Sequence, residues 1–155
     1  MEKGAVISTD QKYRYSLHRI WDTNLPMIAF VGLNPSTADD KIDDPTIKRC
    51  IEFTKSWNYG GFYMLNLFGY RATNPKELTK TKDPIGTENE THILEILSNV
   101  EKVICAWGNQ GRLLNQNTKI LSLIDNPYCL KVNKSGEPSH PLYLSKDLKP
   151  VEYKK

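Results

Sequence analysis

The sequence has few cysteines, and their placement argues against the structures that cysteines usually build. Cys50, Cys105 and Cys129 are far apart, odd in number and never in CxxC spacing. A disulfide framework needs an even set, and a zinc site needs closely spaced pairs of ligands. We therefore expect three buried, reduced thiols in a cytoplasmic protein, and no metal site.

Long apolar segments and cofactor-binding motifs are absent as well. No apolar run approaches the ~20 residues that a membrane-spanning helix requires, and the amino terminus lacks the apolar core of a signal peptide. The sequence contains neither GxGxxG nor the GxxxxGKS/T loop, and no serine stands in a GxSxG turn. We expect no membrane segment, no cofactor and no covalent serine chemistry.

The net charge gives only weak information about the class of partner. The formal net charge is +3 over 155 residues, which permits an anionic partner without requiring one. The length fits a single domain, residues 1–155, and we expect it to be a monomer.

Apolar strands alternate with amphipathic helices along the chain. Residues 5–21 form two extended runs around a turn, and in the second run Tyr13, Tyr15 and Leu17 alternate with polar residues (Arg14, Ser16, His18). This is the period-two pattern of a half-buried strand, and it predicts an antiparallel hairpin at a sheet edge. The following elements are expected to be strands over Met27–Leu33, Phe62–Phe68, Lys102–Trp107 and Tyr128–Val132, and helices from Pro45, over Gly86–Val100 and over about Arg112–Ile124.

This order of elements predicts the fold. Strands that alternate with helices form a parallel sheet covered on both faces. We expect an α/β protein, a three-layer α/β/α sandwich with a central four-stranded parallel sheet and the N-terminal antiparallel hairpin. The tail from Ser145 onward shows no periodicity.

Polar residues stand near or after the carboxyl ends of the four predicted parallel strands. They are Asn34-Pro35-Ser36, Asn66, Trp107-Gly108-Asn109 and Ser139-His140-Pro141. Open α/β sheets bind ligands at the carboxyl ends of their strands, so these tips are expected to meet. Amides, an imidazole and an indole suit a planar, hydrogen-bonding ligand and the stabilisation of charge on it. The alternative is an ordinary strand–turn–helix corner in which Asn34-Pro35 acts only as a turn.

A cluster of acidic residues follows the first strand tip: Asp39, Asp40, Asp43 and Asp44. Its spacing is not that of a calcium loop, and no histidine joins it. We interpret these residues as solvated charge and helix caps, with Asp44 as the N-cap of a helix that starts at Pro45.

Four short motifs, in order, resemble the uracil-DNA glycosylase superfamily. GLNPS at 32–36 is similar to its first motif, and LNLFGYRA at 65–72 to the stretch whose asparagine reads the uracil edge. VICAWGNQGRLLN at 103–115 resembles the apolar strand that ends in Trp-Gly, and SHPLYL at 139–144 resembles the HPSP motif. The chain is also similar to the DUF1643 family, which shares GLNPSTAD and the DDPT segment.

The glycosylase resemblance implies a function and a set of site residues. The function is hydrolysis of the N-glycosidic bond of uracil or a modified pyrimidine in a flipped nucleotide, with single- or double-stranded DNA or a free nucleotide as partner. Asn34 would position water and His140 would stabilise the departing base, as the two catalytic residues, while Asn66 would read the base edge. The implied substrate-binding residues are Gly32, Leu33, Pro35, Ser36, Asn66, Arg71, Trp107, Gly108 and Pro141.

Two departures from the superfamily pattern bear on this function. Asn34 lacks the carboxylate that accepts a proton, so the reaction should be slow unless an acid such as Asp39 or Asp44 helps. Leu142-Tyr143 replaces the Ser-Pro that follows the histidine, and Leu142, Tyr143 and Leu144 are candidates either for a wedge in DNA or for burial. A protein that binds a nucleobase, nucleotide or DNA without cleavage, and a hydrolase of free nucleotides, are the alternatives.

Overall fold

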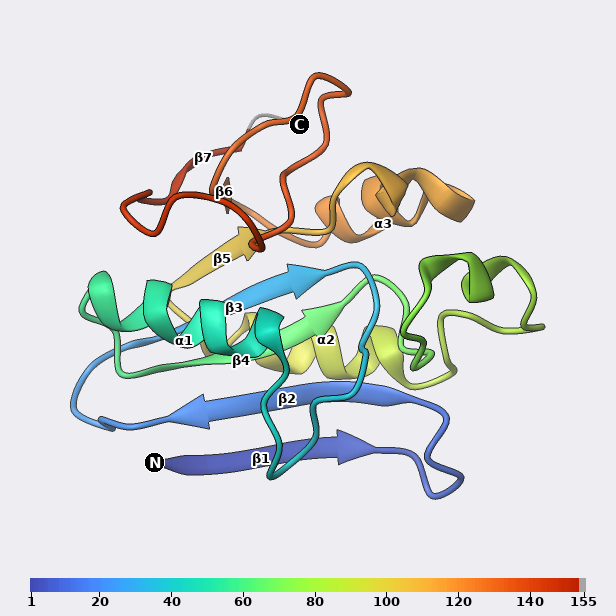
Figure 1. Cartoon of the computed structure of the whole chain (residues 1–155), viewed down its shortest axis with the longest axis horizontal. Helices are drawn as coiled ribbons and strands as arrows, with labels where there is room; N and C mark the ends of the chain where they lie inside the picture. The colour runs from blue at the N-terminus through green and yellow to red at the C-terminus, as the bar shows by residue number, and fades with distance from the viewer. Residues whose placement is uncertain (154–155) are drawn as a thin grey trace.

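The computed structural model describes residues 1–153, which form an α/β domain around one mixed sheet (Figure 1). Its seven strands lie in the order β1-β2-β4-β3-β5-β6-β7. Strands β4, β3, β5 and β6 pair in parallel, whereas β1, β2 and β7 pair antiparallel with their neighbours. The predicted α/β class is confirmed. The strands are β1 (Glu2–Ile7), β2 (Arg14–Ile20), β3 (Met27–Gly32), β4 (Gly61–Asn66), β5 (Lys102–Cys105), β6 (Pro127–Cys129) and β7 (Val151–Glu152).

Helices cover both faces of this sheet because successive strand residues point to opposite sides. Helix α1 (Pro45–Ser56) packs on the face of Phe30 and Met64. Helices α2 (Asn89–Leu97) and α3 (Gln116–Leu121) pack on the other face, with Val31 and Cys105. None of the helices within residues 1–153 is long and apolar enough to cross a membrane.

Helix α1 begins where the sequence predicts. The Asp44 carboxylate accepts the backbone N–H of Ile47 at 2.9 Å, and Pro45 occupies the first turn, where its missing N–H costs nothing. The cap fixes the amino end of α1 beside the carboxyl ends of the strands.

The N-terminal hairpin is confirmed, but the half-buried pattern predicted for its second strand is wrong. Strand β2 pairs with both β1 and β4, and Arg14, Ser16 and Arg19 are all buried. The segment 38–43 covers both arginines: Arg14 donates to the carbonyl oxygen of Ala38, and Arg19 donates to the Asp43 carboxylate at 2.8 Å and to the carbonyl oxygens of Asp39 and Ile42. Two arginines are therefore built into the interior.

The carboxyl-terminal third differs from the prediction in two places. The helix expected over about Arg112–Ile124 is a 3-10 segment, η2 (Asn109–Asn115), followed by the short α3, because Leu114 and Asn115 have φ of 54° and 55°. The tail contains β7, which pairs with β6 although the tail shows no periodicity. A second 3-10 segment, η1 (Pro75–Thr79), lies in the long polar loop after β4.

Candidate functional site

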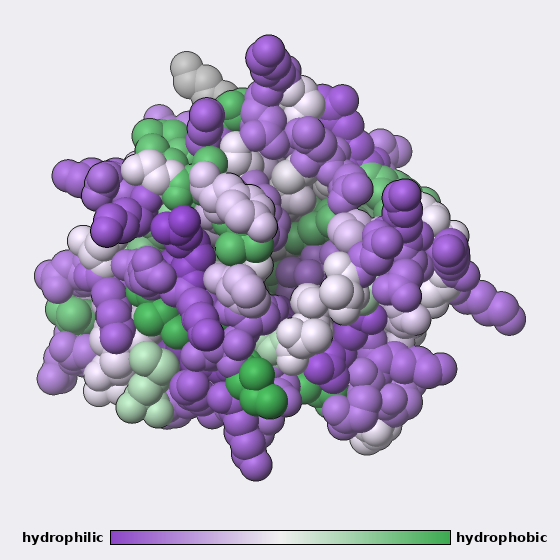
Figure 2. Space-filling view, viewed as in Figure 1, coloured by the Kyte–Doolittle hydropathy of each residue, from purple (hydrophilic) through white to green (hydrophobic). Residues whose placement is uncertain are grey.

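A cavity of about 690 Å³ opens at the carboxyl ends of β3, β4 and β5, within the size range of small-molecule sites. Figure 2 shows a hollow near the middle of this face of the molecule. Strand tips, the amino end of α1 and the loop after β6 all contribute to its lining. The predicted site residues that line it are Gly32, Leu33, Asn34, Pro35, Ser36, Asn66, Trp107, Gly108 and His140.

Two predicted site residues lie outside this lining. Arg71 is half-buried and donates to the carbonyl oxygen of Gln11 at 3.3 Å. Pro141 is buried between two residues that do line the cavity, His140 and Leu142.

Asn34 reaches the cavity from the end of β3 with its amide in a fixed orientation. Its Nδ2 donates to the carbonyl oxygen of Ala72 at 2.8 Å and to that of Pro35 at 3.1 Å. The nitrogen is therefore committed to the backbone, and Oδ1 is the atom that Asn34 offers to a ligand or a water.

Asn66 ends β4 and is 2% exposed. Its Oδ1 accepts from Nη2 of Arg14 at 3.3 Å, and its carbonyl oxygen accepts from the Asn89 side chain at 2.9 Å. Its Nδ2 lies against β3, where a Cβ on Gly32 would come within 3.0 Å of it. Glycine at position 32 thus gives the Asn66 amide room at the cavity.

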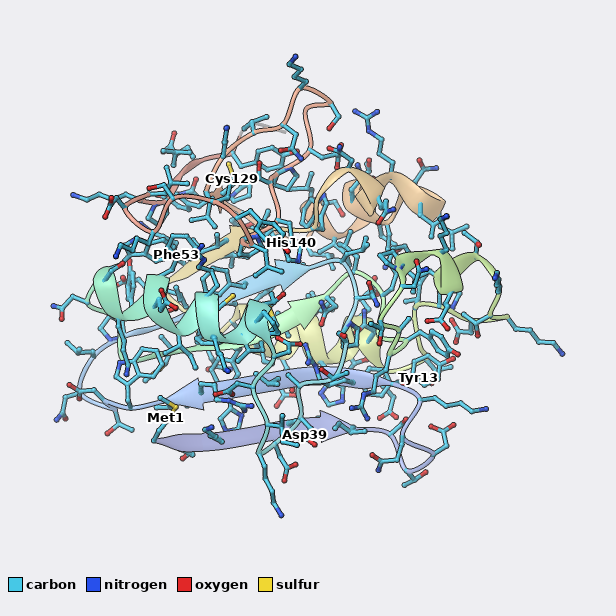
Figure 3. The ribbon with its side chains drawn as sticks, in the orientation of Figure 1. Met1, Tyr13, Asp39, Phe53, Cys129 and His140 are labelled. Atoms are coloured by element: carbon cyan, nitrogen blue, oxygen red, sulfur yellow. The ribbon has the colours of Figure 1, made fainter. Side chains whose placement is uncertain are left out.

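His140 lies at the mouth of the cavity and near the centre of this face (Figure 3). Its Nδ1 accepts the backbone N–H of Leu142 at 3.2 Å, so the proton of the neutral ring is on Nε2. Desolvation by the surrounding protein lowers the pKa of His140 below 6.5, and the charge of Asp44 opposes this shift. At neutral pH the ring is therefore an uncharged Nε2–H donor.

The two candidate acids of the sequence have different positions. Asp44 is the only acidic residue that lines the cavity among the residues described. Asp39 is outside the lining and accepts the backbone N–H groups of Lys41 and Ile42 at 2.8 Å each. Figure 3 shows Asp39 well apart from His140, over the hairpin edge of the sheet.

Trp107 and Gly108 contribute backbone and ring surface rather than a free donor. The Trp107 indole is 1% exposed, and its Nε1 donates to the Glu137 carboxylate at 2.9 Å. Gly108 has φ of 76°, a conformation that favours glycine, and its N–H donates to the carbonyl oxygen of Pro138 at 2.8 Å. These bonds tie the tip of β5 to the loop that carries His140.

Replacing Glu137 by glutamine should destabilise the protein by about 1–3 kcal/mol, since an amide nitrogen would then face donors. Glu137 is 6% exposed and accepts from Trp107, from Asn117 at 3.0 Å and from Arg112 at 3.2 Å. Urea unfolding measures the effect, with Arg112→Gln as the control, because the Arg112 side chain is 60% exposed and should contribute under about 1 kcal/mol. Equal stability of wild type and Glu137→Gln would contradict this account of the loop.

Sequence reasoning missed part of the cavity wall. The alternation of residues 13–18 predicts that Arg14 lies on the polar face of a half-buried strand, whereas its burial depends on contacts with residues 38 and 66, far away in sequence. The apolar and small residues of the wall carry no local signal. The other lining residues that the sequence does not indicate are Thr37, Pro45, Thr46, Ile47, Met64, Ala72, Thr73, Pro75 and Gln110, whereas Asp44, Asn109 and Leu142 are among the residues that the sequence singles out.

Comparison with known proteins gives one match. Neither the curated proteins nor the solved structures contain a match to this chain. The family model described as "Protein of unknown function (DUF1643)" matches residues 14–142, which include both buried arginines, all the strand tips and His140. This match covers most of the chain, and the protein therefore belongs to the DUF1643 family.

Proposed function

We propose that this protein is a uracil-DNA glycosylase-like hydrolase that cleaves the N-glycosidic bond of uracil or a modified pyrimidine in a flipped nucleotide. One observation carries the proposal: Asn34, Asn66 and His140 come from three separate segments and line one cavity. The order of their motifs and the four parallel strands at the centre of the sheet support a relationship to the glycosylase superfamily.

The proposed reaction creates opposite charges in its transition state, positive on the sugar and negative on the leaving base. The Nε2–H of neutral His140 donates to the base oxygen on which negative charge accumulates. That contact strengthens as the bond breaks, so it lowers the barrier instead of only binding the substrate. Asn66 Nδ2 donates to a carbonyl oxygen of the base edge, which favours a keto group over an amino group at that position.

Attack on the sugar requires an oriented water and a proton acceptor. Asn34 Oδ1 orients the water, since its Nδ2 is committed to Ala72 and Pro35. Asp44 supplies the carboxylate: one oxygen caps α1, and the other makes no hydrogen bond within residues 1–153. The proton passes from the attacking water to this second oxygen as the base leaves with the bonding electrons.

The position of Tyr143 supports DNA as the substrate. Tyr143 directly follows Leu142 at the cavity, is 96% exposed and has φ of 67°. An aromatic ring held outward beside a base pocket is positioned to occupy the gap that a flipped nucleotide leaves in the stack. Its neighbour Leu144 instead packs against the hydrophobic core.

A protein of the same fold that binds a base or nucleotide without cleavage is the second candidate. Two features favour it: Asn34 is an amide, and one Asp44 oxygen is already used as a helix cap. The two candidates differ in product, because a binding protein releases no free base.

Single-turnover incubation with a panel of oligonucleotides tests the proposal. The panel contains uracil, mismatched thymine, hydroxymethyluracil and cytosine, each in single and double strands, with the released base identified by mass spectrometry. We expect release of a keto pyrimidine and none of cytosine. Binding of these strands without release of a base would contradict the proposed hydrolase activity and support the second candidate, binding without cleavage.

The rate of base release should be constant at neutral and mildly alkaline pH and fall as the pH drops through the lowered pKa of His140, below 6.5. Protonation places a hydrogen on Nδ1, which can then no longer accept the Leu142 N–H. The ring loses the bond that orients its Nε2–H towards the base, and the rate of base release falls. A pH–rate profile measures this, with His140→Gln as the variant that should lack the transition. A rate that rises on acidification below pH 6.5 would contradict this role for His140.

A further inference from the structure

Arg14 is a buried cation in the wall of the same cavity, and it has no role in the function proposed above. It is 2% exposed and lines the cavity. Its guanidinium donates to two neutral acceptors, the carbonyl oxygen of Ala38 at 3.1 Å and Asn66 Oδ1 at 3.3 Å. Its Nε is buried and has no hydrogen-bond partner.

The other buried arginine of β2, Arg19, shows which partners a buried arginine with a structural role has in this fold. Arg19 is 0% exposed, and its Nε donates to the Asp43 carboxylate at 2.8 Å. Its two terminal nitrogens donate to three carbonyl oxygens. Arg14, on the same strand, makes no ion pair with any acidic residue in residues 1–153.

The charges around Arg14 compensate it only in part. Asp44 lines the same cavity and favours the charged form of Arg14, whereas Arg71 and Arg19 are like charges that oppose it. Asp44 is itself engaged at the amino end of α1, where the helix dipole stabilises its negative charge. Desolvation lowers the pKa of Arg14 to about 10, so the side chain keeps its charge at neutral pH.

Buried charges in proteins are ordinarily paired, and an unpaired guanidinium beside a cavity is favourable only if a ligand supplies the anion. We propose that Arg14 forms a subsite for an anionic oxygen of the ligand. The oxygen belongs either to the phosphoryl group of a nucleotide or to the charged ring of the departing base. The inference rests on the proposed function only in taking this cavity as the ligand site, and it does not require cleavage.

Calorimetric titration of four probes tests the subsite: inorganic phosphate, uridine 5′-monophosphate, uridine and uracil, the last at increasing pH. Replacing Arg14 by glutamine should weaken binding of the anionic probe by roughly tenfold to a hundredfold, the usual range for a hydrogen bond to a charged group. Uridine, which has no anionic oxygen, should lose less affinity than the anionic probe, and only through Asn66, whose Oδ1 accepts from Arg14. Lys12→Gln is the matched control, because it removes the same charge from an exposed residue two positions away.

The probes separate the two sources of the anion. A phosphoryl subsite predicts that the monophosphate binds wild type at least about tenfold more tightly than uridine does. A subsite for the base predicts that uracil binds more tightly as rising pH removes its ring proton. Arg14→Lys keeps the positive charge but lacks the planar guanidinium. It should retain part of the preference for the anionic probe even if Arg14→Gln does not fold.

Two results overturn the inference: no preference of wild type for any anionic probe, or a preference that Arg14→Gln retains in full. Failure of the proposed function has a different signature. If no base is released but Arg14-dependent binding of an anion is found, the hydrolase is wrong and the subsite stands. If base is released and the Arg14 variants bind every probe as wild type does, only the subsite is wrong.

Discussion

Replacing Asn34 by alanine should slow base release by about a hundredfold or more, the usual scale for loss of one preorganised group at a reaction centre. The reason is geometric: two carbonyl acceptors hold Nδ2, so that Oδ1 is left to orient the attacking water. Alanine removes the oxygen and leaves the backbone turn. Single-turnover rates on the best oligonucleotide of the panel measure the loss.

Two controls separate this effect from damage to the loop. Asp40→Ala changes an exposed residue of the same loop, outside the cavity lining, and should leave the rate unchanged. Urea unfolding of Asn34→Ala reports the cost of losing the two hydrogen bonds, expected at about 1–3 kcal/mol. A stable Asn34→Ala protein with wild-type rate would remove Asn34 from the mechanism.

Replacing Arg19 by methionine should destabilise the protein by about 3 kcal/mol or more, because it removes the buried donor of a partly buried carboxylate and leaves several carbonyl oxygens without their donor. Arg19 joins β2 to the loop 38–43, the segment that closes one side of the sheet. Urea unfolding at pH 7 measures the change.

Lys3 offers a matched control on the same carboxylate. Its Nζ lies 3.3 Å from Asp43, but its side chain is 34% exposed, so Lys3→Met should cost under about 1 kcal/mol. Burial alone would raise the pKa of Asp43, yet the bonds from Arg19 and Lys3 outweigh it and lower the pKa below 3.8. The stabilisation is therefore present above pH 3.8 and lost as the pH falls through that lowered pKa. The bonds from Arg19 to carbonyl oxygens do not titrate, so only part of the difference between wild type and Arg19→Met should disappear in acid. A difference that stays the same as the pH falls through the pKa of Asp43 would contradict this explanation.

The sequence predicts the elements whose signals are local. An apolar run that ends in glycine marks β3, and the Asp44-Pro45 pair marks the start of α1, since capping depends only on neighbouring residues. The meeting of the strand tips follows from a topological rule, because parallel strands end at one edge. That rule brings Asn34 and Asn66 to one cavity, and the loop after β6, bonded to the tip of β5 through Gly108 and Pro138, adds His140.

Features that depend on distant contacts could not be predicted in this way. Arg14 has the polar alternation of a solvated strand, and only the covering segment 38–43 makes it interior. Strand β7 has just two residues and is held by pairing with β6, far from it in sequence. The break before α3 occurs at Leu114 and Asn115, where backbone conformation overrides a helical apolar pattern.

The most direct test of the account is a mass balance on one uracil-containing single strand, with wild type beside His140→Ala. The account predicts one free uracil for each abasic site formed, and a rate reduced about a hundredfold or more in the variant. If the oligonucleotide stays intact while uridine still binds in the cavity, the result would contradict the proposed hydrolase activity. The protein would then be one that binds a nucleobase without cleaving it.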